Sequence, residues 1–397
     1  MFTLIKRFFM ASLVTLVLLG AVQGSDSPSP SDVAVGPHKY SLLSWEVEHF
    51  FEKWAHKLQD ILPWNSEPSR EVRIAQAQEF FDIRSQIRDL EREFGSDNSV
   101  QIRLLEQRRS DMQPDVEETM ESEISSIIAQ EGFVSRIGVI FPPVDVVYAA
   151  SPGALIISPR DRIAQINSTL LKPGLSGLLR GELEDLIFRE DDVSALIVST
   201  GGVATYPSVV SATGSLHDAL IITAHEWLHH WFFFQPLGQH FWDNAEMTTL
   251  NETAASIGGE TIGDRAFTAM TGEVVNREPE PSNTPSDPDE FDFTAEMRET
   301  RIEAEELLTD GRIEEAEAYM EERRQFLEEN GYFIRKINQA FFAFHGSYAT
   351  GAGSVSPIGD QLEDVRDNLD SLEDFLKIVG EFNQVSDLAD YLGVGRP

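Results

Sequence analysis

The stretch His225-Glu226-Trp227-Leu228-His229 lies near the middle of the chain, and the rest of the sequence is best understood around it. In a helix of 3.6 residues per turn, His225 and His229 project from the same face about one turn apart, so both imidazoles can reach one metal ion. Glu226 is one position further round. Its carboxylate can therefore take a proton from a water at the metal's open position instead of binding the metal.

The flanking residues predict a buried helix. Ser215 and Asp218 have the Ser-x-x-Asp spacing of a capping box, and Gly214 before them disfavours helix. The residues that follow are mostly apolar: Leu216, Leu220, Ile221, Ile222 and Ala224. We therefore expect a helix over residues 216–233 inside the domain, where a metal ion would partner histidines that are costly to bury alone. The alternative is a buried helix whose polar side chains are satisfied by hydrogen bonds.

A catalytic zinc ion takes three protein ligands and leaves its fourth position to water, so a third ligand must come from elsewhere. Asn251 and Glu252 lie on a second predicted helix, over residues 244–262. Small residues on nearly the same side as Glu252 would let this helix approach the first closely: Ala255, Ser256 and Gly259. We expect Glu252 to point at the metal.

This arrangement resembles the gluzincin class of metallopeptidases, whose His-Glu-x-x-His pattern is followed some two dozen residues later by an Asn-Glu pair on the next helix. The resemblance covers residues 201–259. It implies a Zn²⁺ cofactor held by His225, His229 and Glu252, with Glu226 as general base. It also implies a zincin-like fold of the α+β class, mostly helical, in which a small β-sheet precedes the two metal helices and helical segments flank them.

The chain departs from related patterns at several positions. The class often has an acidic residue one turn after the third ligand; here it is Ser256, so Ser256 or another group must orient a ligand histidine. The residue six past His229 is Gln235, which excludes the metzincin extension.

Aminopeptidases of the class often carry Gly-x-Met-Glu-Asn between Gly201 and Val210. This chain has no acidic residue there, which weakens an assignment as an aminopeptidase. Four residues remain rival ligands: His230, His240, Glu246 and Glu260.

Composition limits the function classes. The 397 residues are 41% hydrophobic, which is enough for a sizeable core and for two or three domains. The formal net charge of −36 repels phosphates at long range, and this excludes nucleic acid and an anionic membrane surface as partners. There is no cysteine, so neither disulfides nor thiolate ligands are available.

Residues 1–24 predict a secretory signal peptide. Lys6 and Arg7 precede an apolar run over residues 8–22, and small residues follow it. The run is short for a membrane span. We expect an exported protein, periplasmic or extracellular, with a flexible leader over residues 25–41. The alternative is a retained segment that anchors the chain, which is the one membrane contact that we expect.

The rest of the chain divides into four parts: an N-terminal helical region (42–132), a zincin-like catalytic core (133–276), an acidic Pro-rich linker (277–292) and a C-terminal helical subdomain (293–397). In the N-terminal region we expect amphipathic helices, one over 42–62, with breaks at 95–98 and near Pro114. In the core we expect strands over 137–141, 144–149, 154–157 and 195–199 and a helical interval over 161–189. After the linker we expect helices over 293–308 and 312–329, and two or three more after residue 357.

Gly201 and Gly202 precede the predicted metal helix. An edge strand at this place in gluzincins binds peptide by main-chain pairing, and two glycines would let another backbone approach closely. We assign both residues to substrate binding. A bulged hairpin without a ligand role is the alternative.

Residues 332–344 predict an aromatic helix with a polar stripe. Arg335, Asn338 and His345 share one side of the helical wheel, and Tyr348 lies just beyond. Because the C-terminal helices of gluzincins supply a His or Tyr that stabilises the oxyanion, the resemblance implies a catalytic role for His345 and Tyr348. We assign Arg335 and Asn338 to substrate binding, with Arg335 holding a substrate carboxylate or a buried carboxylate partner. A satisfied structural network is the alternative.

The function that follows is an exported zinc-dependent peptidase. Glu226 would deprotonate the attacking water and pass the proton to the leaving amine. A peptide or protein is the expected substrate. Two alternatives remain: a zinc hydrolase of a non-peptide amide, such as a cell-wall component, and a noncatalytic binding module that keeps the metal fold as a scaffold.

Overall fold

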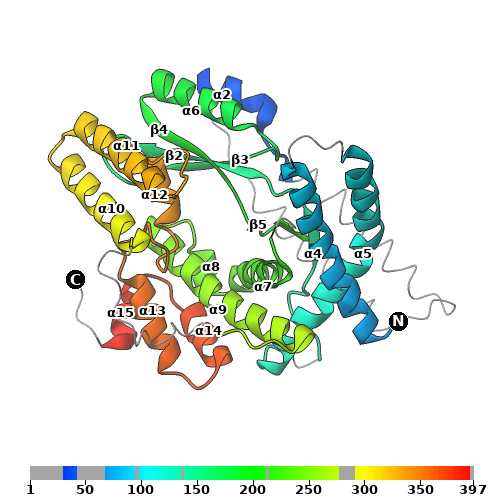
Figure 1. Ribbon diagram of the computed structural model, residues 1–397. Coiled ribbons are helices and arrows are strands. Elements are labelled where there is room, and N and C mark those ends of the chain that lie inside the picture. The colour runs from blue at the N-terminus through cyan, green and yellow to red at the C-terminus, as the bar shows by residue number, and fades with distance from the viewer. Residues whose placement is uncertain are drawn as a thin grey trace.

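A computed structural model describes residues 30–42, 68–93, 98–135, 138–211, 214–276 and 291–393 (Figure 1). The chain is mostly helical and has two small sheets of three strands each, which confirms the predicted α+β, mostly helical class. The predicted signal peptide, nearly all of the helix expected over 42–62 and most of the acidic linker lie outside the described residues. Among the described helices, none has the length and apolar character needed to cross a membrane.

Residues 30–41 differ from the flexible leader that we expected. They form helix α2 (Pro30–Val35) and the short 3-10 helix η1 (Gly36–His38). Val35 is buried in a cluster with side chains of α6 (Gly177–Asp191). The Tyr40 N–H then donates to the Leu170 carbonyl at 2.9 Å. One apolar side chain and two strand-like hydrogen bonds, the second joining the Lys172 N–H to His38, hold this segment against the sheet.

Helices α4 (Arg70–Arg92) and α5 (Ser99–Gln130) pack against each other and form the N-terminal helical layer. The break expected near Pro114 is wrong, because α5 continues through it. An interior proline costs a helix about 3 kcal/mol. Met112 packs against the core before Pro114, and Val116 and Met120 are buried after it, so a continuous apolar face offsets this cost.

The two sheets lie between these helices and the C-terminal part. The first consists of β1 (Val146–Ala149), β6 (Ser208–Ser211) and β5 (Gly202–Val203), in the order β1-β6-β5, with β1 parallel and β5 antiparallel to β6. The second is antiparallel and consists of β3 (Asn167–Leu171), β2 (Gly153–Pro159) and β4 (Val193–Ser199), in the order β3-β2-β4.

Two predictions for this region are wrong. The described residues 138–141 do not form a strand, and the interval 161–189 is not helical throughout. Its first half contains β3, which pairs with β2, and the helix α6 begins only after Pro173 and Gly174. Ser176 caps α6, because its hydroxyl accepts a hydrogen bond from the Leu179 N–H. The pairing with β2 is a tertiary contact that the local sequence does not reveal.

Helix α7 (Leu216–Phe233) has the predicted limits, and its capping box between Ser215 and Asp218 is formed. After the short helix α8 (Pro236–Gln239), helix α9 (Ala245–Thr271) begins where we expected and runs past the predicted end at residue 262. Glycines let α9 lie close to α7. A Cβ added at Gly259 would lie 3.0 Å from the His225 Cα, and one at Gly263 would lie 2.7 Å from the Ile221 Cα.

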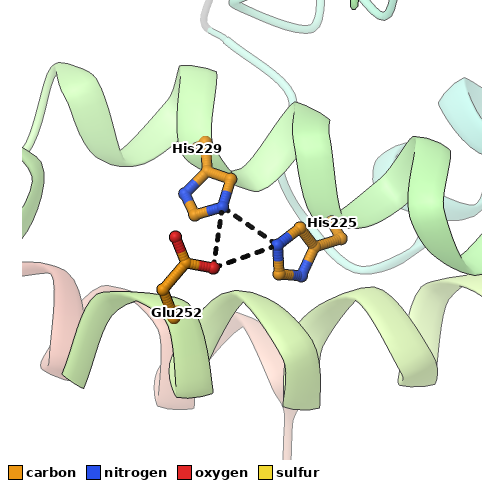
Figure 2. A group of neighbouring side chains, drawn as sticks. All are labelled: His225, His229 and Glu252. Atoms are coloured by element: carbon orange, nitrogen blue, oxygen red, sulfur yellow. Dashed lines mark hydrogen bonds and ion pairs between the residues drawn. The ribbon is translucent and has the colours of Figure 1, made fainter. Parts of the chain in front are cut away.

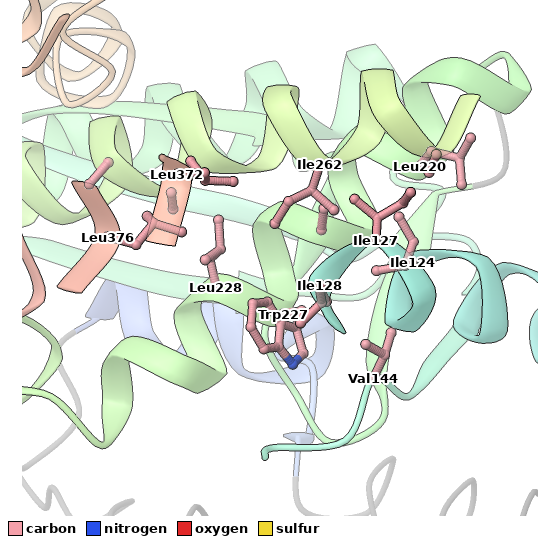
Figure 3. Packing of buried hydrophobic residues seen from close by; sticks show 14 of the residues in the cluster. Ile124, Ile127, Ile128, Val144, Leu220, Trp227, Leu228, Ile262, Leu372 and Leu376 are labelled. Atoms are coloured by element: carbon pink, nitrogen blue, oxygen red, sulfur yellow. The ribbon is translucent and has the colours of Figure 1, made fainter. Parts of the chain in front are cut away.

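The main core joins α7 and α9 to α5 and to the last three helices of the chain (Figure 3). Trp227 and Leu228 of α7 pack with Ile262 of α9, with isoleucines of α5 and with Leu372 and Leu376 of α14. The C-terminal helices are α10 (Phe293–Thr309), α11 (Ile313–Glu329), α12 (Gln339–His345), α13 (Ile358–Asp367), α14 (Leu372–Gly380) and α15 (Ser386–Leu392). This core fixes the two helices that carry the predicted metal ligands.

The helix predicted over 332–344 is wrong in its first half. Helix α12 begins only at Gln339, because the Asn338 side chain accepts a hydrogen bond from the Phe341 N–H at 2.9 Å and caps the helix there. Arg335 and His345 therefore do not share a helical face. The polar stripe that we expected on one helix does not exist.

Candidate metal centre

Helices α7 and α9 bring His225, His229 and Glu252 together (Figure 2). The Nε2 atoms of the two histidines are 3.0 Å apart. The Glu252 Oε2 atom lies 3.5 Å from each of these nitrogens. The three residues predicted as ligands thus form one compact group of two imidazole nitrogens and one carboxylate oxygen.

These distances fit a metal ion. Ligand atoms placed tetrahedrally around zinc, about 2.0–2.1 Å from it, are about 3.3–3.4 Å from one another. The three distances between donor atoms here bracket that value. In addition, no described residue offers the buried Glu252 Oε2 a hydrogen bond of normal length, and a buried carboxylate oxygen is costly without one. The group can therefore hold a metal ion.

The same group shifts the pKa values of its members. Burial would lower the pKa of His229, but the charge of the nearby Glu252 carboxylate outweighs burial and raises the pKa to about 9. Burial would raise the pKa of Glu252, but its interactions with His229 and His225 outweigh burial and lower it. A metal ion bound by these side chains would compete with protons for the same ligand atoms.

Asn251 orients one ligand. Its side-chain oxygen lies 3.0 Å from Nδ1 of His229, so that ring can donate there and present Nε2 to the metal. Ser256 was a candidate for this role, but its hydroxyl donates to the Glu252 backbone carbonyl at 2.8 Å. The signal that we missed was the residue directly before Glu252: Asn251 is buried, and its side chain faces α7.

Replacing Asn251 by Ala should weaken metal binding about 10- to 100-fold, because groups that orient metal-bound histidines typically have effects of this size. Competition titration with a chromogenic chelator measures the affinity. The matched control is Asn244→Ala, which removes the cap of the same helix without touching a ligand. An affinity equal to that of the control would show that Asn251 does not orient His229.

Glu226 lies beside the ligands and is 6% exposed. Burial raises the pKa of its carboxyl, the two histidines lower it and Glu252 raises it further; the net direction is upward. The backbone of β5 closes over it: a Cβ added at Gly202 would lie 2.4 Å from Glu226 Oε1. The carboxylate therefore lies between the histidine pair and an edge strand, where Gly201 and Gly202 were predicted to bind substrate.

Replacing Gly202 by Ala should displace the Glu226 side chain, since 2.4 Å is far inside van der Waals contact. If Glu226 acts as a base, we expect turnover to fall about tenfold or more with little change in metal content, because small misplacements of catalytic groups are costly. Gly181→Ala on α6 is the control, because nothing lies within 4 Å of its added Cβ. Equal activity of the two variants would contradict this account.

Tyr348 reaches the metal centre from the C-terminal part. Its ring centroid lies 6.5 Å from that of His225. The charge of Glu252, burial, the charge of Glu226 and a hydrogen bond to Glu252 raise the pKa of Tyr348 well above its ordinary value, so the phenol stays protonated. His345 packs against Phe341 and Phe344, and it lines the same cavity as Tyr348. Burial lowers the pKa of His345.

Arg335 and Asn338 are engaged elsewhere. Arg335 donates to both carboxylate oxygens of the buried Glu184, at 2.8 and 2.5 Å. This is the buried carboxylate partner that we gave as one of two roles for Arg335. Asn338 caps α12 and donates to the Ala195 carbonyl at 3.0 Å. The two residues form part of a structural network.

The rival ligands lie outside the metal group found in the described residues, which consists of His225, His229 and Glu252. His230 is adjacent to His229 in the sequence, but its ring packs against Tyr206. His240 pairs with Asp243 at 2.6 Å. Glu246 and Glu260 likewise do not belong to the group.

Comparison with family models, with curated proteins and with solved structures finds no match for this chain.

Proposed function

We propose that the protein is an exported zinc-dependent peptidase of the gluzincin type. The observation that carries the proposal is the group of His225, His229 and Glu252 at tetrahedral spacing, with the buried Glu226 beside it. Two imidazoles and one carboxylate are a donor set of catalytic zinc sites. The arrangement of a small sheet followed by two packed metal helices supports the zincin-like fold.

Zinc bound by these ligands would polarise a substrate carbonyl and lower the pKa of water to about 7. Side chains of the protein would transfer the protons and stabilise the developing charge. Glu226, fixed by the backbone at Gly202, would accept a proton from the attacking water and deliver it to the leaving amine. Tyr348, which stays protonated, would donate a hydrogen bond to the negative charge that develops on the substrate oxygen.

The edges of the two sheets support a peptide substrate. On β1, the N–H groups of Val146 and Tyr148 donate to Glu121 and Glu117 of α5, at 3.0 and 2.9 Å. On β3, residues 38–40 add strand-like hydrogen bonds. Both edges are thus covered by this chain itself and cannot receive another strand.

The edge of β4 is covered as well. The Ile197 N–H donates to Glu184 at 2.7 Å, and the Ile197 carbonyl accepts from Arg335 at 3.1 Å. Among the sheet edges and the chain segments that the structure describes, the edge that remains is that of β5. Because Gly201 O accepts from the Ser211 N–H of β6, the backbone groups of Gly202 face the other way, as alternate residues of an antiparallel pair do. A substrate strand paired there would lie beside Glu226.

The direct test is metal analysis of the purified protein together with a peptide assay. We expect about one zinc per chain and hydrolysis of casein-like peptides that a chelator abolishes and zinc restores. Hydrolysis of cell-wall fragments without hydrolysis of peptides would favour the non-peptide amide. Metal binding without any turnover would leave only the noncatalytic module.

A further inference from the structure

A cavity of about 600 Å³ lies between β4, α10, α12 and the segments on either side of α12. This volume is within the range of about 300–1,000 Å³ that is typical of ligand pockets. Its walls are mainly apolar side chains from separate parts of the chain: Leu196, Val198, Phe293, Met297, Ile334 and Phe341. Three elements that are distant in sequence, β4, α10 and α12, therefore build one mainly apolar cavity.

The charged residues at the cavity wall are neutralised by neighbours. Arg335 is paired with Glu184, and Lys336 lies 3.1 Å from Glu184 and 3.3 Å from Asp185. Burial lowers the pKa of His345, so this side chain is neutral at neutral pH. An occupant of the cavity would thus meet apolar surface without an unpaired charge.

The cavity adjoins the metal centre through Tyr348. This side chain lines the cavity, and its ring centroid lies 6.5 Å from that of His225. On the opposite wall the cavity follows β4 from Leu196 to Ser199, three residues before Gly202. A chain paired at the β5 edge beside Glu226 would therefore have the cavity within reach of a side chain adjacent to the bond being cleaved.

We propose that this cavity is the specificity pocket of the enzyme and that it receives a large apolar side chain of the substrate, such as Phe, Leu or Met. The proposal rests on the proposed peptidase function and narrows its substrate class. Burial of such a side chain favours a large apolar residue over Ala by about 10- to 100-fold, as transfer of its apolar surface predicts. Since α10 supplies Phe293 and Met297, the C-terminal subdomain would set specificity.

The pocket can be tested by filling it. Ala352 lines the cavity and is partly exposed, so Ala352→Trp places an indole in the space with little change to the core. Peptides that differ only in one residue, Phe or Ala, are compared. The wild type should cleave the Phe peptide at least tenfold better in kcat/KM, and Ala352→Trp should lose at least tenfold on the Phe peptide while its activity on the Ala peptide changes less than twofold.

Two further variants, at exposed positions, test the pocket without altering the hydrophobic core. Phe333 lines the cavity yet is 83% exposed, so Phe333→Ala should fold normally and lower the preference for the Phe peptide several-fold. The matched control is Leu178→Ala, which removes another strongly exposed apolar side chain that lies outside this cavity. The control should keep the wild-type preference.

A binding measurement separates the pocket from catalysis. Glu226→Gln protein loaded with zinc is titrated with the same two peptides carrying a dansyl group, and the Phe peptide should bind at least tenfold more tightly. If the enzyme cleaves the Phe and Ala peptides equally well, or if Ala352→Trp leaves the preference for the Phe peptide unchanged, the cavity is not the specificity pocket. Either result would leave the proposed peptidase activity standing. Absence of any turnover that depends on Glu226 would refute the peptidase, and the two Kd values would still decide whether the pocket selects apolar residues.

Discussion

Replacing Glu226 by Gln should lower kcat/KM for peptide hydrolysis by about 10²- to 10⁴-fold, the range expected for loss of a general base. Gln has nearly the same shape but cannot accept the proton of the attacking water. Glu226 is not part of the ligand group, so the variant should keep its full zinc content. Parallel measurement of zinc by atomic absorption and of turnover on a fluorogenic peptide separates these two properties.

The matched control is Glu246→Gln, which makes the same chemical change at an exposed position of α9. It should retain wild-type turnover. Full activity of the Glu226 variant would show that another group serves as base. Loss of zinc from it would instead show that Glu226 supports the metal, contrary to the geometry described above.

Replacing Glu184 by Ala should destabilise the protein by about 2–4 kcal/mol. Removing one partner of a buried ion pair typically costs about 3–5 kcal/mol, and the partial exposure of Arg335 and Lys336 reduces this cost. The Glu184 side chain is fully buried and accepts from Arg335, Lys336 and the backbone of Ile197. Its loss leaves two cations facing each other and one N–H of β4 without its acceptor.

Denaturant unfolding of the full chain, with zinc at constant excess, measures this effect through the midpoint at unchanged slope. The matched control is Glu182→Ala, an exposed glutamate two positions earlier on α6, which should change stability by less than about 0.5 kcal/mol. Equal midpoints for the two variants would mean that the network of Glu184 contributes no stability.

The ligand group could be predicted from the sequence because its geometry is local. His225 and His229 are one helical turn apart, and the capping residues Ser215 and Asn244 fixed where both metal helices begin. Glu252 needed one tertiary assumption, that the two helices lie side by side. Small residues made that assumption reasonable: the helices come close at Gly259, one of the small residues named in the sequence, and also at Gly263, beyond the predicted end of the second helix.

Other features depend on contacts between distant segments and were missed. A hydrophobic pattern does not show that β3 would pair with β2, or that Asn338 would end the segment before α12. The partner of Arg335 is 151 residues away in sequence, so its role could be stated only as an alternative. The apolar cavity likewise exists only once β4, α10 and α12 are assembled.

The carboxylates that cover strand β1 bear on how this chain behaves before it has finished folding. Glu117 and Glu121 come from α5, so the edge of β1 is protected only once that helix has docked. In a chain whose α5 has not yet docked, an exposed edge on the apolar strand Val146–Ala149 would promote pairing with other chains and aggregation. We therefore expect that docking of α5 onto β1 during folding protects the protein from aggregation at high concentration.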